Sequence, residues 1–241
     1  MTRVFNFSGG RTSAYMVIHY WLPGDIVLFC DTGREHPMTY KFIEDFEKHE
    51  GILVVRLQYP GGWEGFLKHW NQGKSIPNRV MRQCTIELKI KTARRFLRSL
   101  GIIRYENFIG FRYDEAIRVK RHTEHWKKVV TRFPLYEDRV IKQQIRDYFK
   151  TKPYDLEIPS ILGNCDLCFM KGKNAVMAIL KQYPELADKW IADEEAETNV
   201  YRHTYFKEMT MREIRDLAQS ALTRQYELEL ISPEFNCACT A

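Results

Sequence analysis

The first 21 residues constrain the fold more than any other stretch of the chain. Residues 4–7 form a short apolar run typical of a buried strand, and Ser8-Gly9-Gly10 interrupts it. A helical pattern begins at Arg11 and ends before Pro23-Gly24. Two adjacent glycines allow positive φ and let an anion approach the backbone without meeting a Cβ. The stretch therefore predicts a strand, a tight turn and a helix in immediate succession.

This junction has the features of a phosphate-binding loop. The first free N–H groups of a helix point at an anion placed there, and the helix dipole favours it. The hydroxyls of Ser8, Thr12 and Ser13 add side-chain donors. A turn whose glycines serve only close packing remains the alternative, and neither Gly-x-x-x-x-Gly-Lys-Ser/Thr nor Gly-x-Gly-x-x-Gly occurs here.

The next elements continue the pattern and predict a parallel sheet. An apolar strand over residues 26–30 ends in Asp31-Thr32-Gly33, a helix starts at Pro37, and a third strand covers 52–59. Such a βαβαβ order predicts right-handed crossovers and ligand binding beyond the carboxyl ends of the strands. Asp31 would either cap its turn or accept a hydrogen bond from a ribose hydroxyl or an adenine amine.

The rest of the chain predicts an α/β domain over residues 1–170 and a helical C-terminal extension over 171–241, packed on the same domain. Residues 60–85 are rich in Gly, Trp and Asn, and we expect a long irregular active-site loop there. Further predicted elements are a helix over 86–100, strands over 107–111 and 129–133, a helix over 139–149, and helices over 174–183, from Pro184 and from the capping box Thr210-Met-Arg-Glu213.

Charge is concentrated in one segment. The chain carries a net charge of +6, yet residues 74–132 hold 16 Lys/Arg against 5 Asp/Glu, so the remainder is negative. Such a field attracts polyanions, either a nucleotide with several phosphates or a nucleic acid. No apolar run approaches the roughly 20 residues that a membrane helix needs, and the N-terminus shows no signal-peptide pattern. We therefore expect a cytoplasmic protein without membrane contact.

Six cysteines suggest metal or redox chemistry rather than disulfides in a reducing compartment. Cys165 and Cys168 have metal-ligand spacing, but one Cys-x-x-Cys needs further ligands, and the candidates are Cys84, Cys237 and Cys239. Two buried thiols acting as small hydrophobic groups are the alternative. Cys30 lies inside an apolar strand and is expected in the core.

Several short motifs, in a fixed order, resemble one family. Ser8-Gly9-Gly10-x-x-Ser13 is similar to the PP-loop of the adenine nucleotide α-hydrolase and phosphoadenosine phosphosulfate (PAPS) reductase superfamily. Many ATP-cleaving members carry Asp where Thr12 stands. The other matching segments are Asp31-Thr32-Gly33, Arg82-x-Cys84-Thr85 with Leu88-Lys89-Ile90, the run from Gly110 and Arg112 to Arg118, and Pro134-Leu135.

This resemblance implies where a nucleotide and a metal would bind. The adenine nucleotide would lie across Ser8–Ser13, including Arg11, and across Asp31–Gly33, while Gly110, Arg112 and Arg118 would hold its distal phosphate or sulfate. Cys165 and Cys168, with Cys84 or the tail cysteines, would hold a [4Fe-4S] cluster, and a closed zinc site is the alternative. The family's catalytic thiolate lies in a C-terminal Glu-Cys-Gly-Leu-His motif, which is replaced here by Cys237-Ala-Cys239.

Two enzymatic interpretations and one non-enzymatic interpretation follow. As a reductase, the protein would use Cys237 or Cys239 to attack the sulfur of adenylyl sulfate or PAPS, with a thiol reductant such as thioredoxin releasing sulfite. As a sulfurtransferase, it would cleave ATP with Mg²⁺ to adenylate and thiolate tRNA or DNA, which residues 74–132 would contact. The third interpretation is a nucleotide-sensing protein without turnover.

Overall fold

The structure is a computed structural model and describes residues 1–122, 127–163 and 165–220. Its centre is a sheet in the order β3-β2-β1-β4-β5, in which every neighbouring pair is parallel. The strands are β1 (Thr2–Asn6), β2 (Ile26–Asp31), β3 (Val55–Gln58), β4 (Tyr105–Phe108) and β5 (Val129–Arg132). The predicted parallel α/β fold is confirmed, although β3 and β5 are shorter than expected and β4 begins two residues earlier.

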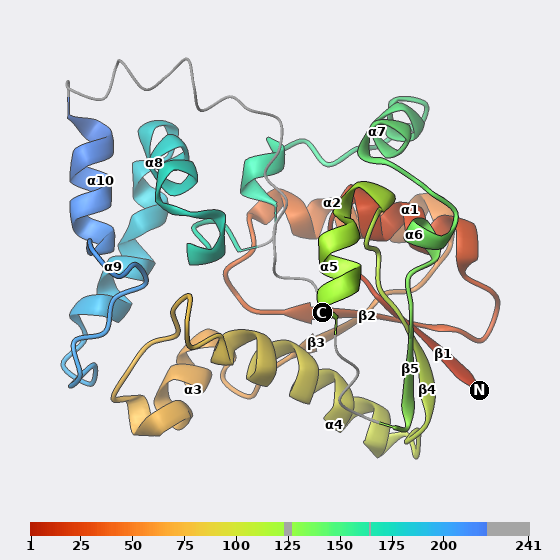
Figure 1. Ribbon diagram of the computed structural model, residues 1–241, viewed down its shortest axis with the longest axis horizontal. Coiled ribbons are helices and arrows are strands. Elements are labelled where there is room, and N and C mark those ends of the chain that lie inside the picture. Colours follow the sequence, from red (N-terminus) through yellow and green to blue (C-terminus); the bar gives the residue numbers. More distant parts are fainter. Residues whose placement is uncertain (123–126, 164, 221–241) are drawn as a thin grey trace.

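Helices cover both faces of this sheet (Figure 1). The segments α1 (Arg11–Tyr20), α2 (Pro37–Glu50) and α7 (Lys142–Lys150) lie on one face, and α4 (Thr92–Ser99) lies on the other. Because strand side chains alternate, Phe5 and Phe29 enter the large core under α1 and α2, whereas Val4 and Leu28 pack with Leu97 of α4. The remaining short elements are η3 (Tyr113–Glu115), α5 (Ala116–Arg121), α6 (Pro134–Glu137), η4 (Ser160–Leu162), η5 (Phe169–Lys171) and η6 (Pro184–Ala187).

The predicted irregular loop over residues 60–85 is wrong in its first half. This region contains α3 (Gly62–His69) followed by the 3-10 turn η1 (Trp70–Gly73). Gly61, Gly62 and Gly65 obscure the helical pattern in the sequence. Gly65 is required because a Cβ there would lie 2.2 Å from the Pro60 carbonyl oxygen. Trp63 and Phe66, three residues apart, are buried in the core and hold the short helix in place.

The predicted helix over residues 86–100 consists of two parts. Residues Thr85–Lys91 (η2) form a π-helix that runs directly into α4. Leu88 is completely buried, whereas Lys89 and Arg94 of the same segment reach the cavity described below. π-Helical turns are rare and occur often at functional sites.

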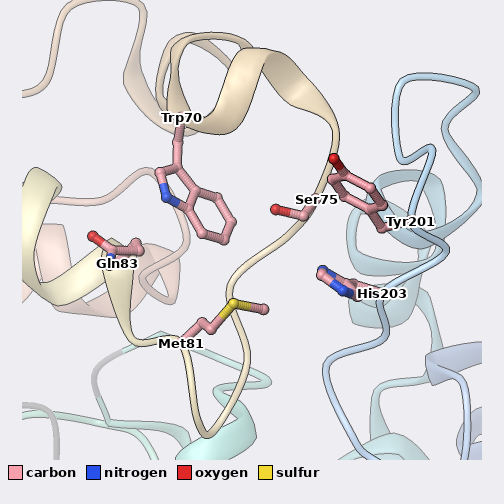
Figure 2. Close-up of a pocket in the computed structure, with 6 residues that line it drawn as sticks. All are labelled: Trp70, Ser75, Met81, Gln83, Tyr201 and His203. Carbon is pink, nitrogen blue, oxygen red and sulfur yellow. The ribbon is translucent and has the colours of Figure 1, made fainter.

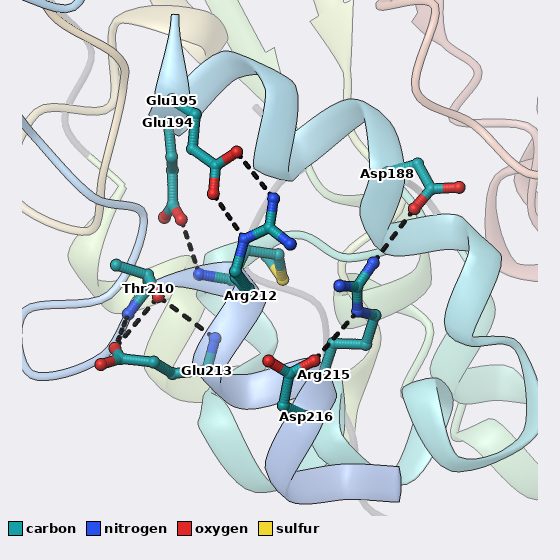
Figure 3. Close-up of polar contacts among 9 residues, drawn as sticks. Asp188, Glu194, Glu195, Thr210, Arg212, Glu213, Arg215 and Asp216 are labelled. Atoms are coloured by element: carbon teal, nitrogen blue, oxygen red, sulfur yellow. Dashed lines mark hydrogen bonds and ion pairs between the residues drawn. The ribbon is translucent and has the colours of Figure 1, made fainter.

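The C-terminal part is helical, as predicted. It contains α8 (Lys173–Gln182), α9 (Asp188–Glu195) and α10 (Met211–Gln219), whose buried residues belong to the same core as those of α1 and α2. Thr210 and Glu213 form the predicted capping box, and the Glu194 carboxylate accepts a hydrogen bond from the Met211 N–H at 2.6 Å (Figure 3). Among the helices of the described ranges, none combines the length and apolar character needed to cross a membrane.

Candidate functional site

The Ser8 loop is a closed turn organised by one buried hydroxyl. Ser13 Oγ accepts a hydrogen bond from the Ser8 N–H at 3.0 Å, lies 3.1 Å from Ser8 Oγ, and donates to the Gly10 carbonyl at 2.9 Å. Gly10 is the N-cap of α1 and has extended backbone geometry. The loop therefore presents the first N–H groups of a 10-residue helix at the carboxyl end of β1.

The two glycines of this loop have different tasks. Gly9 has a φ of +74°, and a Cβ there would lie 2.5 Å from Thr39 Cγ2 of α2. Gly10 has no positive φ, and an added Cβ would meet only Ser8 Oγ at 3.8 Å. Gly9 thus serves close packing, as the alternative interpretation held, whereas Gly10 leaves space beside the helix N-terminus.

Arg11 and Thr12 point to different neighbours. The Arg11 guanidinium binds both oxygens of Asp155 and the Leu156 carbonyl, which ties α1 to the segment after α7. Thr12 Oγ1 accepts a hydrogen bond from Arg112 Nη1 at 3.2 Å. The first loop and the chain after β4 are therefore in direct contact.

A buried carboxylate holds the two predicted arginines. Glu115 is 4% exposed; its Oε2 lies 3.2 Å from Arg112 Nη1, and its Oε1 lies 2.5 Å from Arg118 Nη1. Arg112 also pairs with Asp114, while the Arg118 guanidinium lies over the Phe111 ring at 4.1 Å from its centroid. Arg112 is itself buried, so Arg118 is the arginine of this pair that is better placed to meet a ligand.

The Asp31-Thr32-Gly33 turn uses its side chains locally. Asp31 Oδ1 accepts hydrogen bonds from the Gly33 N–H at 2.7 Å and from the Tyr40 hydroxyl at 2.8 Å. Thr32 is buried and donates to Glu35 at 2.8 Å. The capping role that the sequence allowed for Asp31 is therefore present.

A cavity of about 640 Å³ opens on the α4 face of the sheet and reaches Ser8. On four strands the side chain facing this cavity changes from apolar to polar toward the carboxyl end. The pairs are Val4 and Asn6, Leu28 and Cys30, Tyr105 and Asn107, and Val129 and Thr131. Asn6 Nδ2 donates to Asn107 Oδ1 at 2.6 Å, so the polar row joins neighbouring strands.

Lys and Arg side chains line the same cavity. They come from the segment before η2, from η2 and α4, and from α5: Arg82, Lys89, Arg94, Arg118 and Arg121, with His122 beside them. Of the predicted nucleotide-binding residues, Ser8 and Arg118 are among the lining residues. No motif singles out Asn6, Asn107 and Thr131, whose only signal in the sequence is a polar residue two positions after an apolar one at each strand end.

The cysteines are distributed differently from the expected cluster. Cys165 and Cys168 are buried, and Cys165 Sγ lies 3.3 Å from Thr32 Oγ1. Within the described ranges, no three or more His, Cys, Asp or Glu side chains are arranged to hold a metal ion, so Cys84 does not join Cys165 and Cys168 in such a group. Cys237 and Cys239 lie outside the described residues, and the metal site therefore stays a prediction.

The remaining two thiols are poor nucleophiles. Cys30 does not lie in the core as expected but lines the cavity, and its thiol points to the Lys89 carbonyl at 3.6 Å. Burial raises its pKa to about 11, and burial also raises the pKa of Cys84. Both thiols are therefore protonated at neutral pH.

These features define a nucleotide-binding α/β protein. They are the parallel sheet, the Ser-Gly-Gly loop at its first strand–helix junction and the cavity lined by Lys and Arg at the carboxyl edge of the sheet. The family model of the phosphoadenosine phosphosulfate reductase domain matches residues 2–155. Because this match covers more than half of the chain, the protein belongs to that family, and the resemblance seen in its motifs is confirmed.

Similar proteins include one phage protein and two archaeal proteins. The uncharacterized nin region protein ORF290 of Escherichia phage lambda is 29% identical, over 73% of this chain and 68% of its own length. Two uncharacterized proteins of Methanocaldococcus jannaschii, MJ0066 and MJ0973, are 28% and 24% identical. These two matches cover 76% and 77% of this chain but only 39% and 46% of the archaeal proteins, so the chain spans less than half of their length.

Among solved structures, a PAPS reductase from Candida auris in a phosphate complex aligns with a TM-score of 0.48 and 19% identity. The alignment covers 64% of this chain and 76% of that chain.

Proposed function

We propose that the protein is a PAPS reductase-like enzyme that binds an adenine sulfonucleotide in the cavity on the α4 face and reduces it to sulfite. The observation that supports this most directly is the combination of Ser8, at the N-terminal end of α1, with five Lys and Arg side chains around one cavity. An anion in such a place gains from the helix N-terminus, from the hydroxyl and from fixed positive charge.

In this proposal each part of the cavity meets a different part of the nucleotide. The phosphate and sulfate lie between the Ser8 loop and Arg118, whose guanidinium is fixed by Glu115 and Phe111. The amides of Asn6 and Asn107 supply donors and acceptors for the ribose or base. The apolar end of the cavity, over β1 and β4, takes the flat surface of the adenine.

The proposed reaction needs an accessible thiolate, which we assign to the tail. Cys30 and Cys84 are protonated at neutral pH because of burial, and Cys165 and Cys168 are buried, which favours Cys237 or Cys239 as the nucleophile. Its sulfur would attack the sulfate sulfur, forming an S–S bond and breaking the S–O bond, so that AMP or its 3′-phosphate leaves. A dithiol reductant such as thioredoxin would then take up the oxidising equivalent as a disulfide and release sulfite.

A metal would be held by Cys165 and Cys168, whose thiols lie in one buried turn. Two ligands do not complete a zinc site or a [4Fe-4S] cluster, so further ligands would have to contribute, among them the tail cysteine that is not the nucleophile. No step of the proposed reaction is assigned to this metal.

A second candidate is an ATP-dependent sulfurtransferase that thiolates a nucleic acid. It is favoured by a separate pocket with aromatic walls, lined among others by Trp70, Tyr201 and His203. This pocket adjoins the nucleotide cavity through residues 81–83. In that case Mg²⁺-bound ATP would occupy the cavity and would be cleaved to AMP and pyrophosphate.

One experiment distinguishes the two. Anaerobically purified protein receives adenylyl sulfate, PAPS, or Mg-ATP with RNA or DNA, each with a dithiol reductant. We expect sulfite from a sulfonucleotide and its loss in Cys237→Ser/Cys239→Ser. It should be retained in the control Cys84→Ser, since Cys84 does not line the cavity. Pyrophosphate that depends on nucleic acid would establish the second candidate, and the absence of sulfite where an active reductase works would reject the first.

A further inference from the structure

A second pocket, of about 610 Å³, lies outside the proposed nucleotide site. Its lining comes from two segments far apart in the sequence: Trp70, Ser75, Met81, Gln83, Tyr201 and His203 (Figure 2). The two segments are joined by the Tyr201 N–H, which donates to the Lys74 carbonyl at 3.2 Å. The Asn199 side chain holds the second segment by accepting from the His203 N–H and donating to its carbonyl. The pocket is therefore built by defined contacts between both segments.

Its walls are flat aromatic surfaces. Trp70 stacks on Phe66 with an interplanar angle of 9°, which fixes the indole from behind. Tyr201 and His203 form a tilted pair with ring centroids 5.7 Å apart, and Figure 2 shows them across the pocket from Trp70. Tyr201 is 56% exposed, so this aromatic surface is open to a partner.

Polar groups between these walls suit the edge of a heterocycle. Gln83 offers both an amide N–H and a carbonyl. His203 Nδ1 is buried and has no hydrogen-bond partner among the described residues. A planar ring with donors and acceptors on its edge would fill the space between the aromatic walls and satisfy such groups.

The two segments that line the pocket carry basic and no acidic side chains, with Glu64, Glu87, Glu197 and Glu208 flanking them. Residues 65–86 contain four Lys or Arg and no Asp or Glu, and residues 198–207 add Arg202 and Lys207 without an acidic residue. Arg79 is exposed. An aromatic cage for a cationic ligand would need the opposite environment, whereas stacked bases joined by phosphates need aromatic faces beside positive charge.

The position of this pocket links it to the nucleotide cavity. Met81 and Gln83 line the aromatic pocket, while Arg82 between them lines the cavity on the α4 face. One three-residue segment thus separates the two spaces. A strand bound in the aromatic pocket would have its neighbouring nucleotides next to the proposed site of sulfur chemistry.

We propose that the aromatic pocket holds an unpaired base of a single-stranded nucleic acid, with the adjoining phosphates near Lys74 and Arg79. This binding does not depend on the proposed reductase activity. The same stacking chemistry could come from a free mononucleotide, and the test has a separate arm for that source.

The experiment measures fluorescence anisotropy of labelled RNA and DNA of about 12 nucleotides, single-stranded or as duplexes, with the full chain at several salt concentrations. The variants are Tyr201→Ala, Trp70→Leu, which removes the ring but keeps an apolar side chain, and Arg79→Ala. The control Leu53→Ala removes an apolar side chain that is 74% exposed and lies outside the pocket. A parallel titration with unlabelled AMP and CMP, followed by tryptophan fluorescence, tests the mononucleotide.

We expect single strands to bind more tightly than duplexes. Tyr201→Ala should raise the Kd about five-fold or more, the lower end of what one stacked base contributes, while Leu53→Ala leaves it within about two-fold. Arg79→Ala should reduce the salt slope of log K by about one. The proposal is overturned if no oligonucleotide binds, if Tyr201→Ala and Trp70→Leu both bind like wild type while folded by circular dichroism, or if only mononucleotides bind and quench Trp70.

Discussion

Arg112 Nη1 donates a hydrogen bond to Thr12 Oγ1 at 3.2 Å, although the two residues are 100 positions apart. This bond fixes the chain after β4 against the first turn of α1. A Cβ at Gly110 would lie 3.6 Å from Ser13 Cα, in ordinary contact, so this approach does not require glycine at position 110. Arg112 therefore has a structural role, because it connects Thr12 and Glu115. Arg118 pairs with the other carboxylate oxygen of Glu115 and lines the cavity.

The first prediction concerns Arg118. Arg118→Ala should weaken binding of adenylyl sulfate or PAPS about 10- to 100-fold, because a charge-assisted hydrogen bond contributes about 1.5–3 kcal/mol. The free energy of unfolding should also fall by about 1–3 kcal/mol, because the buried Oε1 of Glu115 loses Arg118 while Oε2 keeps Arg112. Isothermal titration calorimetry measures the Kd. Arg132→Ala is the matched control, because Arg132 also pairs with a glutamate, Glu106, but does not line the cavity. Equal affinities of the two variants would contradict the assignment.

The second prediction separates the two roles of the glycine loop. Gly9→Ala combines a left-handed φ with a clash against Thr39 and should lower the free energy of unfolding by about 2–4 kcal/mol. Gly33→Ala has the same φ of +74° with nothing within 4 Å, so it should cost only about 1 kcal/mol. Gly10→Val should keep the stability and lose nucleotide affinity. Urea denaturation and calorimetry measure these effects, and a stable Gly9→Ala protein would refute the packing role.

The third prediction concerns a buried polar cluster between α3 and α9. Asp193 Oδ2 accepts hydrogen bonds from Arg34 at 2.6 Å, Trp63 at 2.8 Å and Tyr205 at 2.7 Å. Arg34 is only 6% exposed, and Trp63 and Tyr205 are buried, so Asp193→Ala, which removes the acceptor of all three donors, should lower the free energy of unfolding at pH 7 by about 3 kcal/mol or more.

The pH dependence of this cluster has a defined sign. Burial raises the pKa of Asp193 above its ordinary 3.8, in spite of Arg34. As the pH falls, Asp193 therefore becomes protonated at a higher pH in the folded state than in the unfolded state. The free energy of unfolding of wild type, relative to Asp193→Ala, should therefore increase as the pH falls through the raised pKa toward 3.8 and decrease as it rises. Denaturation of both proteins between pH 7 and pH 4 tests this, and a difference that shrinks on acidification would disprove it.

The fourth prediction concerns the metal. Anaerobically purified wild type should contain iron and sulfide and absorb broadly in the visible range, and Cys165→Ser or Cys168→Ser should lose both. Cys30→Ser should keep them, because Cys30 belongs to the cavity rather than to the Cys165 turn. Zinc alone after anaerobic reconstitution would establish the closed structural site instead. Metal-free protein under both conditions would reject both.

Local sequence patterns predict most of the secondary structure of the fold. The apolar run before Ser8, the capping box at Thr210 and the strand ending at Asp31 each depend on neighbours within a few residues, and all were recognised. The helix over Gly62–His69 was missed because its glycines obscure an apolar pattern that only burial of Trp63 and Phe66 makes meaningful.

The sequence by itself determined a parallel α/β protein with an anion-binding loop, since strand, turn and helix signals are local and their order restricts the topology. Only the tertiary structure decided which side chains share the site. The register of β1, β4 and β5 brings Asn6, Asn107 and Thr131 onto one face of the sheet, although Asn6 precedes Asn107 by 101 positions in the sequence. The same packing turns Arg112 inward and leaves Arg118 at the cavity, because one buried carboxylate fixes both.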